Sequence, residues 1–160
     1  MKKSLILSCL AAGAAVLASA SSARAADSWV GTWKLNVARS KFVPGPPPQS
    51  MTLTFEAAAE GAIKLTADGV NGEGKPTHFE YTSPFDGTDT PWIGNPNADS
   101  AAPRRIDANR YENLWKKDGK VVVNVSATVS ADGKTLTVIQ RGKDAQGRVM
   151  DMSEIFERQQ

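Results

Sequence analysis

Few side chains in this sequence are suited to catalysis. His78 is the only histidine, and Glu80, two residues further on, would share its face of a strand. Such a pair suits general base catalysis, but the only cysteine is Cys9 and no serine or threonine stands out as a nucleophile. A lone histidine also falls short of the three or four ligands of zinc. We therefore expect His78 at the surface or rim of the fold, with no catalytic residue and no metal or cofactor site.

A second polar group resembles the first residues of a calcium-binding loop. Its oxygen-bearing side chains lie at alternate positions, Asn95, Asn97 and Asp99. The pattern then fails, because Ser100 occupies the position of the sharp-turn glycine and Ile106 that of the bidentate glutamate. A turn rich in Asn and Asp explains the same residues without a metal. The sequence therefore predicts an ordinary loop here.

The N-terminal residues predict export. Two lysines precede an apolar run over residues 5–18, and small residues follow up to Ala25. We expect residues 1–25 to be a cleaved signal peptide, which leaves residues 26–160 as a single domain in the periplasm or outside the cell. The apolar run is too short for a comfortable membrane span and no later run approaches one, so we expect no span in the mature chain.

The basic charge of the whole chain belongs largely to this leader. The sequence has 19 Lys and Arg against 17 Asp and Glu, a formal net charge of +2. Three of the cations and none of the anions lie in residues 1–25, so the mature chain keeps 16 cations and 17 anions, a net charge near −1. Neither a nucleic-acid partner nor an anionic membrane follows from this charge. Without Cys9 the mature chain also has no disulfide.

Apolar and polar residues alternate through most of the mature chain, as in half-buried strands. Residues 29–36 would place two tryptophans on one face, and the longest strand would place Val121, Val123, Val125, Ala127 and Val129 on one face. Residues 37–50 hold four prolines, which exclude a helix or a ladder, so they form a connector. Phe42 in that connector either turns inward as a plug or rests on a rim.

Turn signals recur at a spacing of fourteen residues, at Gly119, Gly133 and Gly147, as in a meander of strands of equal length. No segment has helical periodicity. Eight to ten evenly spaced strands predict an all-β fold, a closed antiparallel up-and-down β-barrel, because closure removes the exposed strand edges. Aromatic side chains in so narrow a barrel either fill the interior or line a pocket, and both interpretations remain open.

Both ends of the chain resemble those of the calycins, the superfamily of lipocalins and fatty-acid-binding proteins. Gly31 and Trp33 match the Gly-x-Trp of the first calycin strand, and residues 150–158 are similar to the last strand. The resemblance implies that a cation near the C-terminus lies over the Trp33 ring and closes the barrel floor. Arg158 is the favoured candidate over Arg148, and Gly31, Trp33 and Arg158 are expected to be structural residues.

The same resemblance implies that even-numbered side chains of the last strand face the lumen. Fatty-acid-binding proteins place Arg-x-Tyr where this chain has Glu154 and Phe156, so a carboxylate ligand would meet an anion. A carboxyl away from water takes up a proton or pairs with a cation. The candidate cations from other strands are Arg104, Arg105 and Arg110.

The leading interpretation is an exported calycin-like barrel that binds a small apolar molecule, neutral or weakly cationic, without catalysis. The alternative is a packed barrel that serves as a structural or protein-interaction module of the cell envelope, with Trp92 and the loop over residues 95–99 as a contact patch. The candidate ligand-binding residues are Phe79, Tyr81, Trp92, Tyr111, Trp115, Met150, Met152, Glu154 and Phe156.

Overall fold

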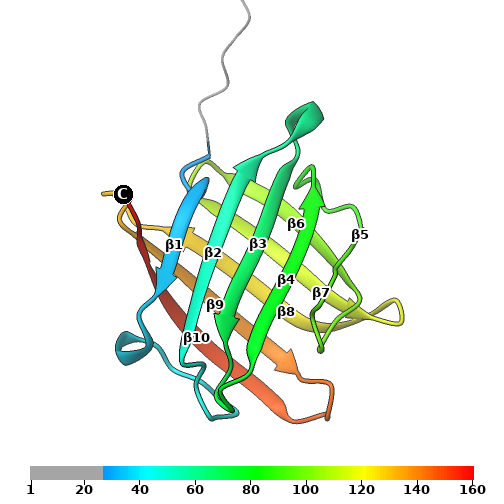
Figure 1. The fold of residues 1–160 in the computed structure, drawn as a ribbon. Coiled ribbons are helices and arrows are strands. Elements are labelled where there is room, and N and C mark those ends of the chain that lie inside the picture. The colour runs from blue at the N-terminus through cyan, green and yellow to red at the C-terminus, as the bar shows by residue number, and fades with distance from the viewer. Residues whose placement is uncertain (1–26) are drawn as a thin grey trace, which may run out of the picture.

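The computed structural model describes residues 27–160, so the expected signal peptide, residues 1–25, lies outside the described residues. Ten strands and two 3-10 turns, η1 (Val37–Arg39) and η2 (Ala59–Gly61), make up this part of the chain (Figure 1), and no helix in it is long and apolar enough to cross a membrane. The strands are β1 (Gly31–Leu35), β2 (Ser50–Ala57), β3 (Ile63–Val70), β4 (Pro76–Ser83), β5 (Thr90–Pro91), β6 (Ser100–Asp107), β7 (Arg110–Lys117), β8 (Lys120–Val129), β9 (Thr135–Lys143) and β10 (Val149–Arg158).

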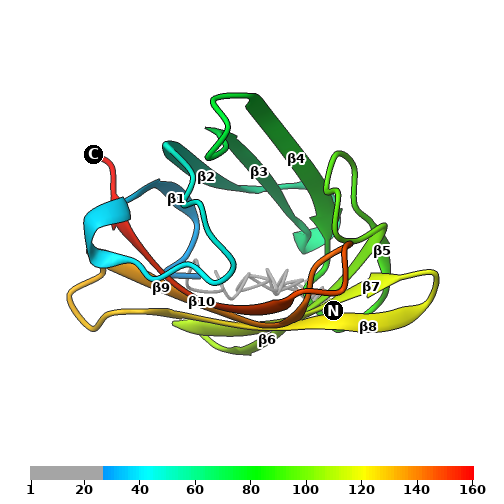
Figure 2. The ribbon, with the colours of Figure 1, turned by 90° about the horizontal axis from the view of Figure 1, so that it is seen from below.

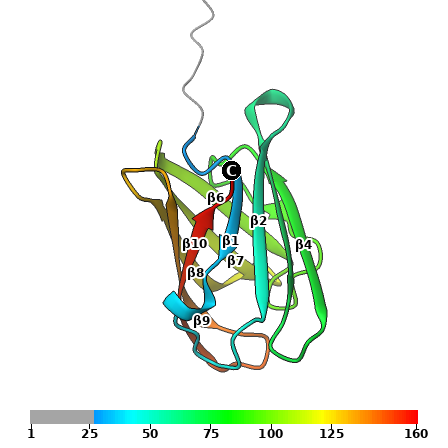
Figure 3. The same ribbon diagram turned by 60° about the vertical axis from the view of Figure 1, so that its left-hand side comes forward.

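The strands form one antiparallel sheet in the order β4-β3-β2-β1-β10-β9-β8-β7-β6-β5. Neighbours in the chain are neighbours in the sheet, and β1 lies between β2 and β10 (Figure 3), which joins the two halves of the meander. Trp33 pairs with Arg158, and Leu35 pairs with Phe156. The predicted all-β up-and-down barrel of eight to ten strands is confirmed.

The barrel closes incompletely between β4 and β5. A single bridge joins Glu80 to Ile93, with two N–H···O hydrogen bonds of 3.0 Å. Gly94 permits this close approach, because its φ is +82° and an added Cβ would lie 2.1 Å from the carbonyl oxygen of His78. A mostly irregular segment, residues 84–99, therefore takes the place of a full-length strand between β4 and β6.

Strand β8 departs from its predicted pattern at one end. Val123, Val125, Ala127 and Val129 are buried, whereas Val121 is 48% exposed. The register between β7 and β8 shifts by one residue next to Trp115. This bulge changes the face on which the residues of β8 before Val123 lie, so Val121 points outward. The prediction that Val121 shares the face of Val123, Val125, Ala127 and Val129 was therefore wrong.

The end of the barrel that contains the start of β1 and the end of β10 is packed solid. Trp33 is fully buried, and the Arg158 guanidinium carbon lies 4.1 Å from the centroid of its ring. The guanidinium also donates three hydrogen bonds to backbone carbonyl oxygens, from Nε to Gly133 at 2.7 Å, from Nη1 to Val30 at 3.0 Å and from Nη2 to Ser28. Three backbone hydrogen bonds therefore hold this cation over the ring, in the manner that the calycin resemblance implies.

Gly31 leaves room for that guanidinium. Its φ is +130°, and an added Cβ would lie 2.6 Å from Nη1 of Arg158. Arg148, the other candidate, instead pairs with Asp144 at 2.6 Å.

Aromatic rings complete the packing behind Trp33. The ring centroids of Trp29 and Phe85 are 6.1 Å apart and stacked, and Arg105 lies 5.7 Å from the Trp29 ring while it pairs with Asp27. We call this region the closed end and define it by Trp29, Trp33, Phe55, Phe85 and Arg158.

Candidate ligand-binding cavity

The opposite end of the barrel holds a cavity of about 220 Å³. Figure 2 views the barrel from this end, where the connector between β1 and β2 and the turn between β9 and β10 lie. The alternative of a filled barrel requires a solid interior, whereas the interior at this end is open. The cavity lining includes every residue that the sequence analysis named for ligand binding, Phe79, Tyr81, Trp92, Tyr111, Trp115, Met150, Met152, Glu154 and Phe156.

Aromatic side chains form one wall of the cavity, because alternation along β4 and β7 turns them inward. Trp92 meets Trp115 edge to face, with ring centroids 4.8 Å apart and planes at 84°, and meets Tyr81 at 5.4 Å and 87°. Tyr111 lies deeper and meets Phe85 of the closed end edge to face, with ring centroids 5.3 Å apart. These rings therefore both line the cavity and pack against the core.

The proline-rich connector between β1 and β2 forms part of the mouth. Backbone hydrogen bonds of 2.8 and 2.9 Å fix Lys41 to Ser153 on β10, which turns the half-buried Phe42 into the cavity. Of the two interpretations that the sequence left open for Phe42, the inward orientation is the one observed. The prolines that line the mouth, which sequence analysis did not assign to the site, are Pro44, Pro46, Pro48 and Pro96.

The loop after β5 borders the mouth from another side. The side-chain oxygen of Asn95 accepts a hydrogen bond from the backbone N–H of Asn97 at 2.8 Å, and that of Asn97 accepts one from Ala145 in the β9–β10 turn at 3.0 Å. Asp99 accepts a bond of 2.9 Å from the N–H of Asp118. These oxygens therefore serve turns, and residues 27–160 contain no cluster of three His, Cys, Asp or Glu that could hold a metal.

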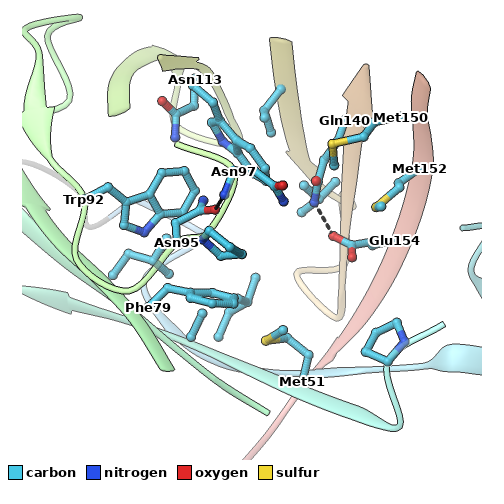
Figure 4. A pocket seen from close by; sticks show the side chains of 18 of the residues that line it. Met51, Phe79, Trp92, Asn95, Asn97, Asn113, Gln140, Met150, Met152 and Glu154 are labelled. Atoms are coloured by element: carbon cyan, nitrogen blue, oxygen red, sulfur yellow. Dashed lines mark hydrogen bonds between the residues drawn. The ribbon is translucent and has the colours of Figure 1, made fainter. Parts of the chain in front are cut away.

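Two polar side chains opposite the aromatic wall form a pair (Figure 4). Gln140 on β9 donates a hydrogen bond of 2.6 Å from Nε2 to Oε2 of Glu154 on β10. Gln140 was missed by sequence analysis, although it continues the alternation that places Leu136 and Val138 inside. Asn113, also missed, lies between Tyr111 and Trp115 on their side of β7 and receives a 3.0 Å hydrogen bond from the N–H of Ala102.

Burial raises the pKa of the Glu154 carboxyl to about 7, although the hydrogen bond from Gln140 acts in the opposite direction. Part of the residue's surface is accessible because it faces the cavity, but that cavity lies inside the barrel, so the carboxyl is poorly solvated. Burial, and to a smaller extent the charge of Glu154, also raises the pKa of the Tyr111 hydroxyl. Near neutral pH the site thus holds a partly ionised carboxyl and a neutral phenol.

Among residues 27–160, the three arginines named as candidate partners of Glu154 all pair elsewhere. Arg104 pairs with Glu112 at 3.1 Å, Arg105 with Asp27, and Arg110 with Asp107 at 3.5 Å. None of the three candidate arginines therefore reaches Glu154, and of the two outcomes left open for this carboxyl, the raised pKa favours uptake of a proton. All three find acidic partners close by in the fold, which removes them from the lumen.

His78 lies on the outer face of β4, away from the cavity. The ring is exposed, and Nδ1 is 2.7 Å from a carboxylate oxygen of Asp68. Glu80 on the same face pairs with Lys64 at 2.7 Å. This exposed cluster matches the expected surface or rim position of His78.

No protein-family model and no curated protein sequence matches this chain. Its fold is similar to that of the wild-type fluorescent protein UnaG, at 11% sequence identity over 82% of this chain and 97% of that one, with a TM-score of 0.50. It is also similar to a redesigned β-barrel, at 14% identity over 86% and 96%, with a TM-score of 0.48. A third similar structure is the tryptamine complex of the amine binding protein of Rhodnius prolixus, at 14% identity over 83% of this chain and 65% of that one, with a TM-score of 0.49.

At these identities the likeness concerns the fold alone. Together with the up-and-down order of the strands and the cation over the tryptophan of β1, the likeness to UnaG defines the fold as a calycin-like β-barrel.

Proposed function

We propose that this protein is an exported barrel that binds a small, largely apolar molecule in its cavity without chemical conversion. The observation that carries the proposal is the cavity itself, a space of about 220 Å³ walled mainly by aromatic, methionine and proline side chains. Pockets of this kind are the usual ligand sites of barrels, where apolar walls supply affinity and a few polar groups orient the ligand.

The size and softness of the walls indicate the kind of molecule. Ligand pockets commonly enclose about 300 to 1,000 Å³, so a volume near 220 Å³ favours a ligand smaller than a typical drug. Met51, Met150 and Met152 add flexible and polarisable surface to the lining. Such walls can adapt to ligands of different shapes.

Glu154 favours a neutral or weakly cationic ligand over a fatty acid. A ligand carboxylate at this position would face a carboxyl and no balancing cation, since the three candidate arginines pair elsewhere. Binding without catalysis is supported by the lining, which among residues 27–160 includes no Ser, Thr, Cys, Lys or His. Export rests on the leader pattern in residues 1–25.

Displacement of a bound neutral fluorophore, N-phenyl-1-naphthylamine, tests the proposal. We expect one binding site per chain and stronger displacement by a neutral apolar competitor than by palmitate. Ala67→Phe should abolish binding because Ala67 lines the cavity, whereas Thr66→Phe, at the next position of β3, should bind normally. Equal binding by both variants would place the fluorophore outside the cavity and contradict the proposal.

A further inference from the structure

The polar pair in the cavity wall presents unused hydrogen-bond acceptors. Gln140 Nε2 donates to Oε2 of Glu154, and this is the one contact between the two side chains. The other carboxylate oxygen and the amide oxygen of Gln140 accept no hydrogen bond from residues 27–160, yet neither atom is sealed from the cavity space. Two neighbouring oxygens, one of them on an ionisable group, are therefore open to a ligand.

No charge in the described part of the chain balances this carboxylate. Burial and the Gln140 hydrogen bond account for the perturbed pKa of Glu154, with no cation contributing to it. A carboxylate in apolar surroundings is costly without a counter-charge, and the cost falls when a cation arrives with hydrogen-bond donors. Residues 27–160 supply no counter-charge for Glu154, so a ligand with a positive group and several N–H donors would provide what this carboxylate lacks.

Aromatic rings provide the rest of a cation-binding environment. Trp92 and Phe79 lie across the cavity from Glu154 (Figure 4), and Tyr111 and Trp115 also line it. Ring faces attract a nearby cation and pack well against another flat ring. The walls thus suit a ligand whose body is aromatic and whose polar end is positive.

We infer that the cavity takes a compact aromatic molecule carrying a primary ammonium or amidinium group, held between the free oxygens of Glu154 and Gln140. This inference rests on the proposed function and narrows its ligand class. One N–H donates to Glu154 and a second donates to Gln140, while the rings enclose the body. An alcohol of the same shape supplies a single donor and no charge, and a carboxylate is repelled.

The ionisation of Glu154 makes the affinity for such a cation depend on pH. Burial raises the pKa of Glu154 to about 7, and among the described residues Tyr111 on β7 is the titratable neighbour with which its charge interacts. Tyr111 stays neutral because burial raises its own pKa. Below pH 7 the cation must compete with a proton, so its affinity should fall about tenfold for each pH unit, whereas the affinity for a neutral analogue should not.

Calorimetric titration with three probes of similar shape tests the inference: 2-phenylethylamine, 2-phenylethanol and 3-phenylpropionate. At pH 8 the amine should bind about tenfold or more tightly than the alcohol, because two of its hydrogen bonds are charge-assisted. That advantage should disappear in Glu154→Gln and at pH 5.5 in the wild type. It should persist in the control Glu157→Gln, which alters an exposed glutamate of the same strand.

Equal affinities of amine and alcohol at pH 8 would overturn the inference and leave the proposed function intact. An amine advantage that survives in Glu154→Gln, or that is unchanged at pH 5.5, would overturn it as well, because the nitrogen would then bind elsewhere. The pH series needs no variant, so it decides the matter even if Glu154→Gln does not fold. If none of the probes binds, and the neutral fluorophore does not bind either, the proposed function fails together with the inference.

Discussion

The two ends of this barrel surround a half-buried charged side chain with different partners. At the closed end, Arg158 lies over Trp33 and donates to three backbone carbonyl oxygens. At the cavity end, Glu154 has one hydrogen-bond partner, Gln140, and no cation from residues 27–160. Strand β10 contributes to both ends, so the difference lies in the partners that the other strands provide. A fully paired charge stabilises the fold, whereas an incompletely paired charge is available to a ligand.

The two ends also differ in packing, which is tight at the closed end and open at the cavity end. The tryptophans of the closed end, Trp29 and Trp33, are fully buried, whereas Trp92 and Trp115 meet edge to face and border empty space. Close packing resists any change in volume, and a cavity lined by flexible side chains accepts a guest. We therefore expect stability to depend mainly on the closed end and affinity mainly on the cavity end.

The largest effect should follow from removing a ring at the closed end. Trp33→Ala should cost about 3 to 5 kcal/mol of unfolding free energy, because it leaves a large void and removes the ring under the Arg158 cation. Trp115→Ala, which removes a half-buried ring beside an existing cavity, should cost about 1 to 2 kcal/mol. Urea denaturation of both variants measures the difference. Equal losses would show that the two ends contribute alike to stability.

Neutralising the cavity carboxyl should stabilise the protein at high pH. The pKa of Glu154 is about 7 in the folded barrel against an ordinary value of 4.5. Between these values the folded state binds more protons than the unfolded chain, so stability is lost as pH rises through them. Glu154→Gln should therefore be more stable than the wild type by about 1 to 3 kcal/mol at pH 8, with little difference at pH 4.5. Denaturation at both pH values, with Glu157→Gln as control, checks this. A stabilisation independent of pH would mean that the titration of Glu154 is not its cause.

The smallest effect concerns the contact between Arg158 and Trp33. A double-mutant cycle with Arg158→Ala and Trp33→Ala should give a coupling of about 0.5 to 2 kcal/mol, as expected for a cation held over an indole face. The single change Arg158→Ala should cost less than Trp33→Ala, because fewer buried atoms are lost. Strict additivity of the two substitutions would show that the contact between Arg158 and Trp33 does not contribute to stability.

Much of the architecture could be predicted from alternation alone. Side chains two residues apart share a face of a strand. Once one face of β10 was assigned to the lumen, Glu154 and Phe156 were therefore both placed there. The same rule, applied one step beyond Val138, would have found Gln140. Residues within a strand are therefore predictable, because their orientation is a local property.

The errors arose where orientation depends on a neighbouring strand. Val121 faces outward because of a bulge against β7, and bulges leave no reliable trace in the alternation of one strand. The partners of Arg104 and Arg105 depend on which acids the fold brings beside them, which a single sequence does not specify. The inward turn of Phe42 likewise depends on hydrogen bonds to a strand more than a hundred residues away.

The positions of the tryptophans and methionines provide the most direct test of the central claim, that one end of the barrel is structural and the other binds a ligand. Two of the four tryptophans, Trp29 and Trp33, lie at the closed end, and Trp92 and Trp115 line the cavity. Three of the four methionines also line it, and the fourth is Met1.

Titration of protein labelled at the tryptophan indole nitrogens and the methionine methyl groups, followed by NMR, would report on both ends in one experiment. With 2-phenylethanol or 2-phenylethylamine as ligand, we predict saturable shifts for the indole signals of Trp92 and Trp115 and for Met51, Met150 and Met152. The signals of Trp29 and Trp33 should stay in place. Shifts confined to the closed end, or equal shifts at both ends, would contradict the division between a structural end and a binding end.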